Sequence, residues 1–300
     1  MPAGQFFTVN DRPAVRVQRR YPQSIETVWG AVTARDHLRQ WFPAPVDIDL
    51  DRANAPIHFG GIDAGAGTAG AVELVDAPHR LVFTWGTDRL TFELTPDGDG
   101  TLFALTHSFE QPSGAPSFAT GWGLCLAGLR AMLAGDPLPP ADRGIVRHEE
   151  LVHEFGLDVP DVTDSAGGWM VRIERQLTCP AAVAWDVWFG EDIVTGEQRA
   201  APAVGEALTP YMAPGRVIGT MTEVDLHRVL AFDITADGGP GDHLRLELND
   251  GTGHGTRVTL TVNGRDPAER DAAAQMWATG ALGHLASAAA AWALAQPING

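Results

Sequence analysis

The sequence predicts an α+β protein built from two tandem copies of one unit, each a curved antiparallel sheet wrapped around a long C-terminal helix. Three observations predict this fold. The 300-residue chain repeats one pattern twice, with its segments in the same order. Within each copy, runs of alternating apolar and polar residues are separated by Gly, Pro and Asp turns, as in antiparallel strands. Each copy closes with apolar residues at helical spacing, and apolar faces of sheet and helix are buried against each other.

The repeat is clearest in the middle of each copy. The segment GAVELVDAPHRLVFTW at 70–85 lies over GTMTEVDLHRVLAFDI at 219–234 without a gap, and Gly, Val, Asp, Leu and Phe coincide. The next segment, DRLTFELTPDGDGT at 88–101, resembles DHLRLELNDGTGHGT at 242–256, with one extra residue in the turn. These matches indicate a tandem duplication.

The same matches set the expected boundaries. We place copy one at 12–135 and copy two at 168–296. Residues 136–167 form the predicted linker, which opens with the proline-rich DPLPP and contains a short helix.

The elements of copy one follow in order. A strand at 15–21 leads to a helix that starts near Pro22 and Ser24, and a second short helix covers 36–42. Alternation predicts strands at 70–76, 80–86, 89–95 and 101–109. The closing helix carries one apolar stripe, formed by Phe118, Trp122, Leu126, Leu129 and Leu133.

Several motifs of copy one resemble a known family. The segments PHRLVFTW, GTLFALTH and the closing GW match, in order and spacing, the SRPBCC superfamily of START-like, helix-grip proteins, on the branch named after the activator of the heat-shock-protein-90 ATPase. The resemblance implies two helix-grip domains. It covers nearly all of copy one and is fainter in copy two, where Val262 stands in the place of His107.

His107 is the candidate catalytic residue. It shares one strand face with Phe103, Leu105 and Phe109, so its imidazole points toward the apolar interior. An imidazole in a cavity can donate a hydrogen bond or move a proton. The alternative is a buried structural histidine, which the resemblance favours because the Thr-His pair belongs to the general pattern of the family.

Aromatic residues of both copies are candidates for lining a cavity between sheet and helix. Flat side chains can stack on a flat apolar ligand; the alternative is ordinary core packing, which is the stronger interpretation for Trp122. The candidate ligand-binding residues are Trp41, Phe42, Phe83, Trp85, Phe103, Leu105 and Trp122 in copy one, and Trp277 and His284 in copy two. By the repeat, His284 replaces Leu129, and a surface histidine is the alternative there.

Composition excludes several classes of function. The net charge of −17 disfavours binding to nucleic acid or to anionic membranes. All 21 basic residues are arginine, so Schiff-base chemistry and a lysine-dependent phosphate loop are excluded. Cys125 and Cys179 form no Cys-x-x-Cys motif, and their spacing fits reduced thiols in a cytoplasmic protein.

No metal or cofactor is expected. His148 and His153 are five residues apart, whereas zinc ligands on one helix face need a spacing of four. The glycine-rich run at 60–70 lacks a phosphate-binding fingerprint and is predicted to be a loop near the cavity entrance.

Three functions remain open at this stage. The first is binding of a hydrophobic or aromatic small molecule. The second is a cofactor-independent enzyme of cyclase or aromatase type from secondary metabolism, with His107 transferring a proton. The third, implied by the name of the resembling branch, is a protein-interaction module with a chaperone partner.

Overall fold

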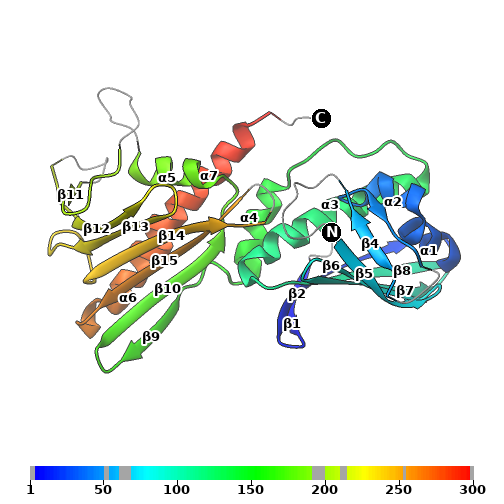
Figure 1. Cartoon of the computed structure of the whole chain (residues 1–300), viewed down its shortest axis with the longest axis horizontal. Coiled ribbons are helices and arrows are strands. Elements are labelled where there is room, and N and C mark those ends of the chain that lie inside the picture. Colours follow the sequence, from blue (N-terminus) through cyan, green and yellow to red (C-terminus); the bar gives the residue numbers. More distant parts are fainter. Residues whose placement is uncertain are drawn as a thin grey trace. The chain divides into compact units, whose positions relative to one another are not determined.

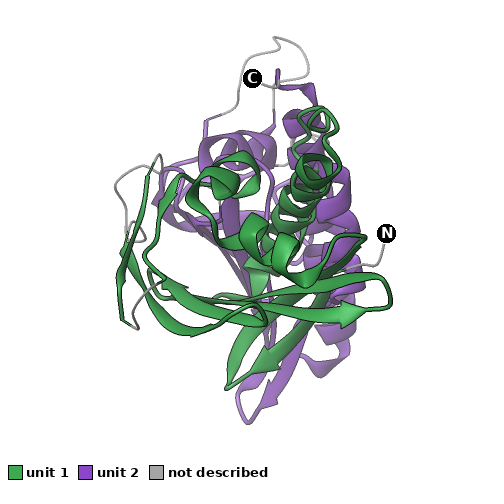
Figure 2. Ribbon diagram, turned by 90° about the vertical axis from the view of Figure 1, so that its right-hand side faces the viewer, with its two compact units in different colours: residues 1–144, 300 green, residues 145–299 purple. Residues whose placement is uncertain are grey.

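The computed structural model describes residues 4–50, 54–60, 69–190, 200–209, 215–252 and 255–297. The chain divides into two compact units, residues 1–144 and 145–299 (Figures 1 and 2). The predicted linker at 136–167 contains a helix and a strand that both lie in the second unit. The glycine-rich run at 60–70 falls almost wholly outside the described residues.

The first unit is built on an eight-stranded antiparallel sheet, in the order β1-β2-β8-β7-β6-β5-β4-β3. Its strands are β1 (Gln5–Val9), β2 (Arg12–Tyr21), β3 (Val46–Asp47), β4 (Pro56–Phe59), β5 (Ala69–Asp76), β6 (Arg80–Trp85), β7 (Asp88–Asp97) and β8 (Gly100–Ser108). The four strands predicted from alternation are therefore confirmed as β5 to β8.

The helices of the first unit gather on one face of this sheet (Figure 2). They are α1 (Ile25–Thr33), α2 (Arg35–Trp41), the short 3-10 helix η1 (Pro112–Gly114) and the long α3 (Ala115–Ala134). The Ser24 side chain accepts a hydrogen bond from the Thr27 amide and caps α1. Gly135 ends α3 in the left-handed conformation that glycine adopts without steric cost.

The second unit repeats the plan with a seven-stranded antiparallel sheet, in the order β11-β12-β13-β14-β15-β10-β9. Its strands are β9 (Asp161–Ser165), β10 (Gly168–Gln176), β11 (Ala207–Leu208), β12 (Gly219–Asp225), β13 (Val229–Ile234), β14 (His243–Asp250) and β15 (Thr256–Gly264). Its helices are α4 (Ile145–Glu154), α5 (Ala181–Phe189), η2 (Pro267–Glu269), α6 (Arg270–Ala273), η3 (Ala274–Ala281) and α7 (Leu282–Ala295). The α+β fold with two tandem copies is confirmed.

Apolar residues of sheet and helix meet in each unit as the alternation predicts. In the first unit, Phe103 and Leu105 of β8 and Leu126 and Leu129 of α3 are all fully buried. Burying such side chains contributes about 1.5–3 kcal/mol each to folding. This core is the frame on which the candidate site is built.

Candidate functional site

His107 lies in the interior of the first unit and uses both of its ring nitrogens. It is 4% exposed. Its Nε2 lies 3.0 Å from Oδ2 of Asp88, and its Nδ1 accepts a hydrogen bond of 3.1 Å from the indole nitrogen of Trp122. The rings of Phe118 and Phe109 pack edge-on against the imidazole, with centroid-to-centroid distances of 4.3 and 5.5 Å. The predicted inward orientation of His107 is confirmed by these contacts.

The hydrogen-bond partners fix the tautomer of His107. An indole nitrogen can only donate, so Nδ1 of His107 carries a lone pair rather than a proton. The proton of the neutral ring is therefore on Nε2, which donates to the Asp88 carboxylate. His107 thus presents an acceptor toward α3 and a donor toward β7.

Asp88 connects this buried ring to the protein surface. Its side chain is 25% exposed, and its Oδ1 lies 3.8 Å from the guanidinium of Arg12. Arg12 is held in place because it also donates to the Thr87 carbonyl at 2.9 Å. The sequence analysis did not identify Asp88, although the pairing register of β7 with β8 would have indicated it. Leu90 pairs with His107, and Asp88 is two residues from Leu90 on the same face of the sheet.

A cluster of aromatic rings lies beside the Trp122 indole. Phe42 follows α2 and has its ring centroid 5.5 Å from both Trp122 and Trp85. Trp85, at the end of β6, stacks on Phe59 of β4 with centroids 4.4 Å apart and planes 8° from parallel. Phe83 lies 6.4 Å from both Phe42 and Phe59. We call Phe42, Phe59, Phe83, Trp85 and Trp122 the aromatic cluster.

The rings of the aromatic cluster are packed against one another. All are buried except Trp85, which is partly exposed. A ligand of this region would therefore bind at the Trp85 side, or between rings that move apart. Phe59 was not among the predicted residues, because its strand is only four residues long and adjoins the glycine-rich run.

The other predicted lining residues of the first unit take structural positions. Trp41 donates its indole N–H to the Ala31 carbonyl at 3.0 Å and joins α2 to α1. Phe103 and Leu105 are fully buried in β8, and the ring of Phe103 lies edge-on to Phe92 at 5.3 Å. These three side chains belong to the core that supports the aromatic cluster.

Residues 22–134, which contain this site, match the family model described as Activator of Hsp90 ATPase homolog 1-like protein. This segment of the chain is similar to that family. The family segment begins just before α1 and ends with α3, so it contains Asp88, His107 and the whole aromatic cluster.

Solved structures resemble the chain at low identity. CalU16 from Micromonospora echinospora is 20% identical over 51% of this chain and 94% of its own, with a TM-score of 0.40. The protein EF2215 from Enterococcus faecalis, described as of unknown function, is 21% identical over 51% of this chain and 91% of its own, with a TM-score of 0.44. DynU16, described as a protein of the dynemicin biosynthetic locus, is 19% identical over 92% of this chain and 98% of its own, with a TM-score of 0.38. No curated protein matches the chain.

The second unit contains a counterpart of the family segment's site without the histidine. Trp277 corresponds to Trp122, but its indole N–H donates to the Pro240 carbonyl at 2.9 Å. Val262 is fully buried at the position of His107. Asp242, which corresponds to Asp88, accepts hydrogen bonds from Arg265 instead. The predicted residue Trp277 is thus buried in the second core.

Loop length explains this exchange of partners. In the family segment, β6 and β7 are joined by only two residues, Gly86 and Thr87. In the second unit, the loop from 235 to 242 joins β13 and β14, and it supplies the Pro240 carbonyl. A buried indole N–H needs an acceptor. The long loop provides that acceptor in one unit, and His107 provides it in the other.

The placement of His284 in a second cavity is wrong, because the side chain is exposed on α7. The cause is the π-helix η3, which inserts one residue into the closing helix. Trp277 follows Trp122 by 155 positions, whereas the buried Leu282 and Leu285 follow Leu126 and Leu129 by 156. Leu285, not His284, therefore occupies the position of Leu129.

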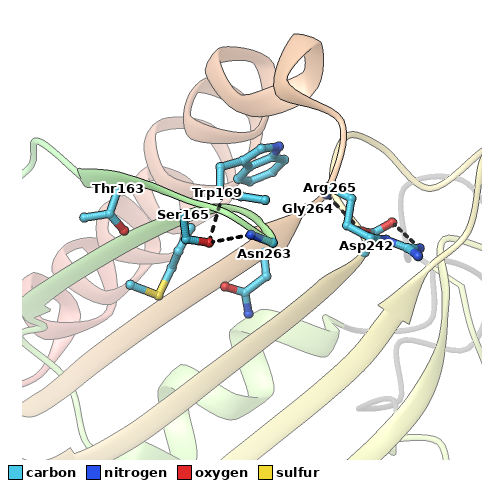
Figure 3. Close-up of a pocket in the computed structure, with 10 residues that line it drawn as sticks. Thr163, Ser165, Trp169, Asp242, Asn263, Gly264 and Arg265 are labelled. Atoms are coloured by element: carbon cyan, nitrogen blue, oxygen red, sulfur yellow. Dashed lines mark hydrogen bonds and ion pairs between the residues drawn. The ribbon is translucent and has the colours of Figure 1, made fainter.

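A pocket of about 390 Å³ lies on the second unit, where the sequence predicts none (Figure 3). Thr163, Met170 and Asn263 pair across β9, β10 and β15 and line it. The ion pair of Asp242 with Arg265 lies at its other end. Polar and charged side chains such as Thr163, Asn263 and Asp242 contribute to its lining, unlike the aromatic cluster of the family segment.

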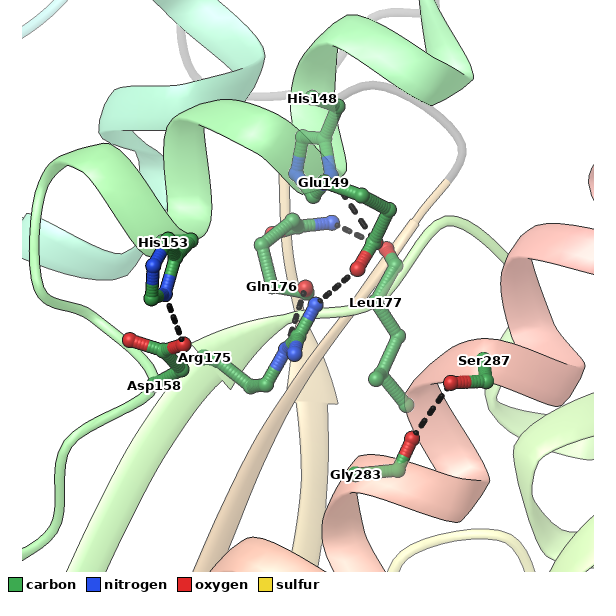
Figure 4. Close-up of polar contacts among 9 residues, drawn as sticks. All are labelled: His148, Glu149, His153, Asp158, Arg175, Gln176, Leu177, Gly283 and Ser287. Atoms are coloured by element: carbon green, nitrogen blue, oxygen red, sulfur yellow. Dashed lines mark hydrogen bonds and ion pairs between the residues drawn. The ribbon is translucent and has the colours of Figure 1, made fainter.

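A partly buried ion pair joins α4 to β10 in the second unit (Figure 4). Arg175 is buried and binds Oε2 of Glu149 at 2.6 Å, while Nδ1 of His148 lies 3.3 Å from Oε1 of Glu149. Burial raises the pKa of Glu149, but the hydrogen bond from His148 and the adjacent Arg175 outweigh burial and lower it overall. His153 pairs with Asp158 instead.

No group of three or more His, Cys, Asp or Glu side chains in the described part of the chain could hold a metal ion. Burial raises the pKa of both thiols, Cys125 and Cys179, to about 12. Among the described residues, no helix combines the length and the apolarity that a membrane crossing needs.

Proposed function

We propose that the first unit binds a flat apolar or aromatic small molecule at its aromatic cluster. The observation that carries the proposal is the parallel stack of Phe59 and Trp85, whose ring centroids are 4.4 Å apart. Two flat rings that contact each other at the edge of the core can also sandwich or flank a third flat ring. The hydrophobic effect would drive such a ligand out of water.

The elements that meet at the cluster support this proposal. Phe42 comes from the end of α2, Phe59 from β4, Trp85 from β6 and Trp122 from α3. Only Trp85 among them is partly exposed, which makes it the ring that an entering ligand meets first. The second unit has Ile234 where the first has Trp85, so it lacks this stack. Binding is therefore proposed for the first unit alone.

The test is equilibrium dialysis of naphthalene against the full-length chain. One molecule should bind per chain, and Trp85→Ala should weaken binding about tenfold, because a stacked pair contributes about 0.5–1.5 kcal/mol beyond the buried area. Ile234→Ala, at the matching position of the second unit, should leave affinity unchanged. Circular dichroism would verify that both variants fold. Absence of binding, or equal losses in the two variants, contradicts the proposal.

A cofactor-independent enzyme is the second candidate, favoured by the contact between His107 and Asp88. A carboxylate that holds one imidazole nitrogen orients the ring as a base and stabilises the imidazolium. Nδ1 is the nitrogen that would take the proton, and Trp122 occupies it. Catalysis would require the indole to move aside, so we rank this function after binding. A chaperone-interaction role would rest on the description of the family alone.

A further inference from the structure

The tautomer of His107 decides which polar group a ligand can offer it. Asp88 holds the proton on Nε2, and Nδ1 is an acceptor directed at the Trp122 indole. A ligand carbonyl, which is itself an acceptor, gains nothing at Nδ1. A hydroxyl group can donate to Nδ1 in place of the indole N–H, and its oxygen can accept from that indole N–H at the same time.

The second unit shows that the tryptophan of this fold does not require a histidine partner. Trp277 donates to a backbone carbonyl, that of Pro240, and Val262 packs where the imidazole would lie. The indole position is thus compatible with more than one acceptor. In the first unit the acceptor is a side chain whose tautomer is set by its contact with the Asp88 carboxylate, which the fold alone does not demand.

We propose that the ligand of the first unit carries an aryl hydroxyl group that inserts between His107 and Trp122. Its O–H donates to Nδ1 of His107, and its oxygen accepts from the Trp122 indole N–H. The ring that bears this hydroxyl lies against the aromatic cluster, next to Phe42 and the displaced indole. Asp88 is then a positioning residue, because it acts on the ligand through His107. This inference rests on the proposed binding function and adds the ligand's chemical class.

The experiment compares 2-naphthol with 2-methoxynaphthalene, which has the same rings and no donor. Calorimetry on the full-length chain should give an affinity about tenfold higher for 2-naphthol, the worth of one net hydrogen bond. Asp88→Asn should reduce this preference, because an amide can also donate to Nε2 and reverse the tautomer. Asp242→Asn, at the matching position of the second unit, should leave the preference unchanged.

A spectroscopic measurement tests the inference without any variant. In the nitrogen-15 spectrum of the wild-type chain, the His107 ring should show a protonated Nε2 and an unprotonated Nδ1. 2-Naphthol should shift the Nδ1 signal and the Trp122 indole N–H signal together.

The outcomes separate the inference from the function on which it rests. Equal affinity for the two probes, or a proton on Nδ1, overturns the hydroxyl inference while aromatic binding stands. If neither probe binds, both the hydroxyl inference and the proposed binding function fail. A preference that Asp242→Asn abolishes as fully as Asp88→Asn also overturns the inference.

Discussion

The indole nitrogen of Trp122 donates to Nδ1 of His107 over 3.1 Å and thereby ties the middle of α3 to β8. Because Asp88 holds the opposite nitrogen of the same ring, three side chains from α3, β8 and β7 form one continuous chain. Its inner end, Trp122, belongs to the aromatic cluster and packs against Phe42, and its outer end reaches solvent through Asp88. Changes along this chain are therefore expected to affect both stability and binding.

Replacing His107 with valine, the residue of the second unit, should destabilise the first unit by about 2 kcal/mol. The substitution leaves the buried Trp122 N–H without its acceptor, and an unsatisfied buried donor costs about 1–3 kcal/mol. Urea denaturation of the full-length chain measures the loss. Thr106→Val, on the same strand but the opposite face, should change stability by less than about 0.5 kcal/mol. Equal effects of the two variants would show that the hydrogen bond contributes little.

The lowered pKa of Glu149 makes the second unit sensitive to acid. The ionised Glu149 carboxylate stabilises the folded state fully at pH values above 4.5, the ordinary pKa of glutamate. This stabilisation is lost as the pH falls through the lower pKa of the folded state. Glu149→Gln should remove this part of the pH dependence. At pH 7 it should cost about 3 kcal/mol, because Arg175 would remain buried without its counter-charge. Urea denaturation between pH 3 and pH 7 measures both effects.

Glu150 provides the matched control for that variant. It is adjacent in sequence but pairs with the more exposed Arg147, and exposed ion pairs contribute little. Glu150→Gln should therefore keep the acid sensitivity of the wild-type chain. If the free energies of unfolding of Glu149→Gln and the wild type differed by the same amount at every pH, the assigned role of Glu149 would be contradicted.

Local sequence signals were sufficient to predict much of the first unit. Strands β5 to β8 alternate clearly and are separated by turn residues, and α3 has an apolar stripe that α-helical geometry preserves. Strand β1 was missed, although Asn10 and Asp11 carry a signal. Both have positive φ, of 48° and 61°, as in the two-residue turns of hairpins. Strand β4 has only four residues, so its alternation of apolar and polar residues is too short to predict a strand.

The candidate site was predictable only where one strand determined it. The inward direction of His107 follows from alternation along β8, which a sequence shows directly. Its partner Asp88 depends on the register between β7 and β8, and the stack of Phe59 on Trp85 depends on two strands separated by β5. Such contacts are set by the packing of the whole sheet and by turn geometry. Neither is visible in a single run of residues.

Burial should make both thiols slow to react with thiol reagents. The thiolate is the nucleophile, and a pKa of about 12 for Cys125 and Cys179 leaves very little thiolate at pH 8. Ellman's reagent should therefore label neither residue within minutes in the folded chain, and both after denaturation in urea. Rapid labelling of one thiol per folded chain would show that one of these sites opens readily.

The π-helix η3 predicts opposite outcomes for two neighbouring substitutions in α7. Leu285 is buried, so Leu285→Ala should cost about 2–5 kcal/mol through lost contacts and the cavity left behind. His284 is exposed, so His284→Ala should change stability by less than about 0.5 kcal/mol. If the closing helix were α-helical throughout, His284 would take the buried position of Leu129 and the order of the two losses would reverse. Urea denaturation of the two variants distinguishes these registers.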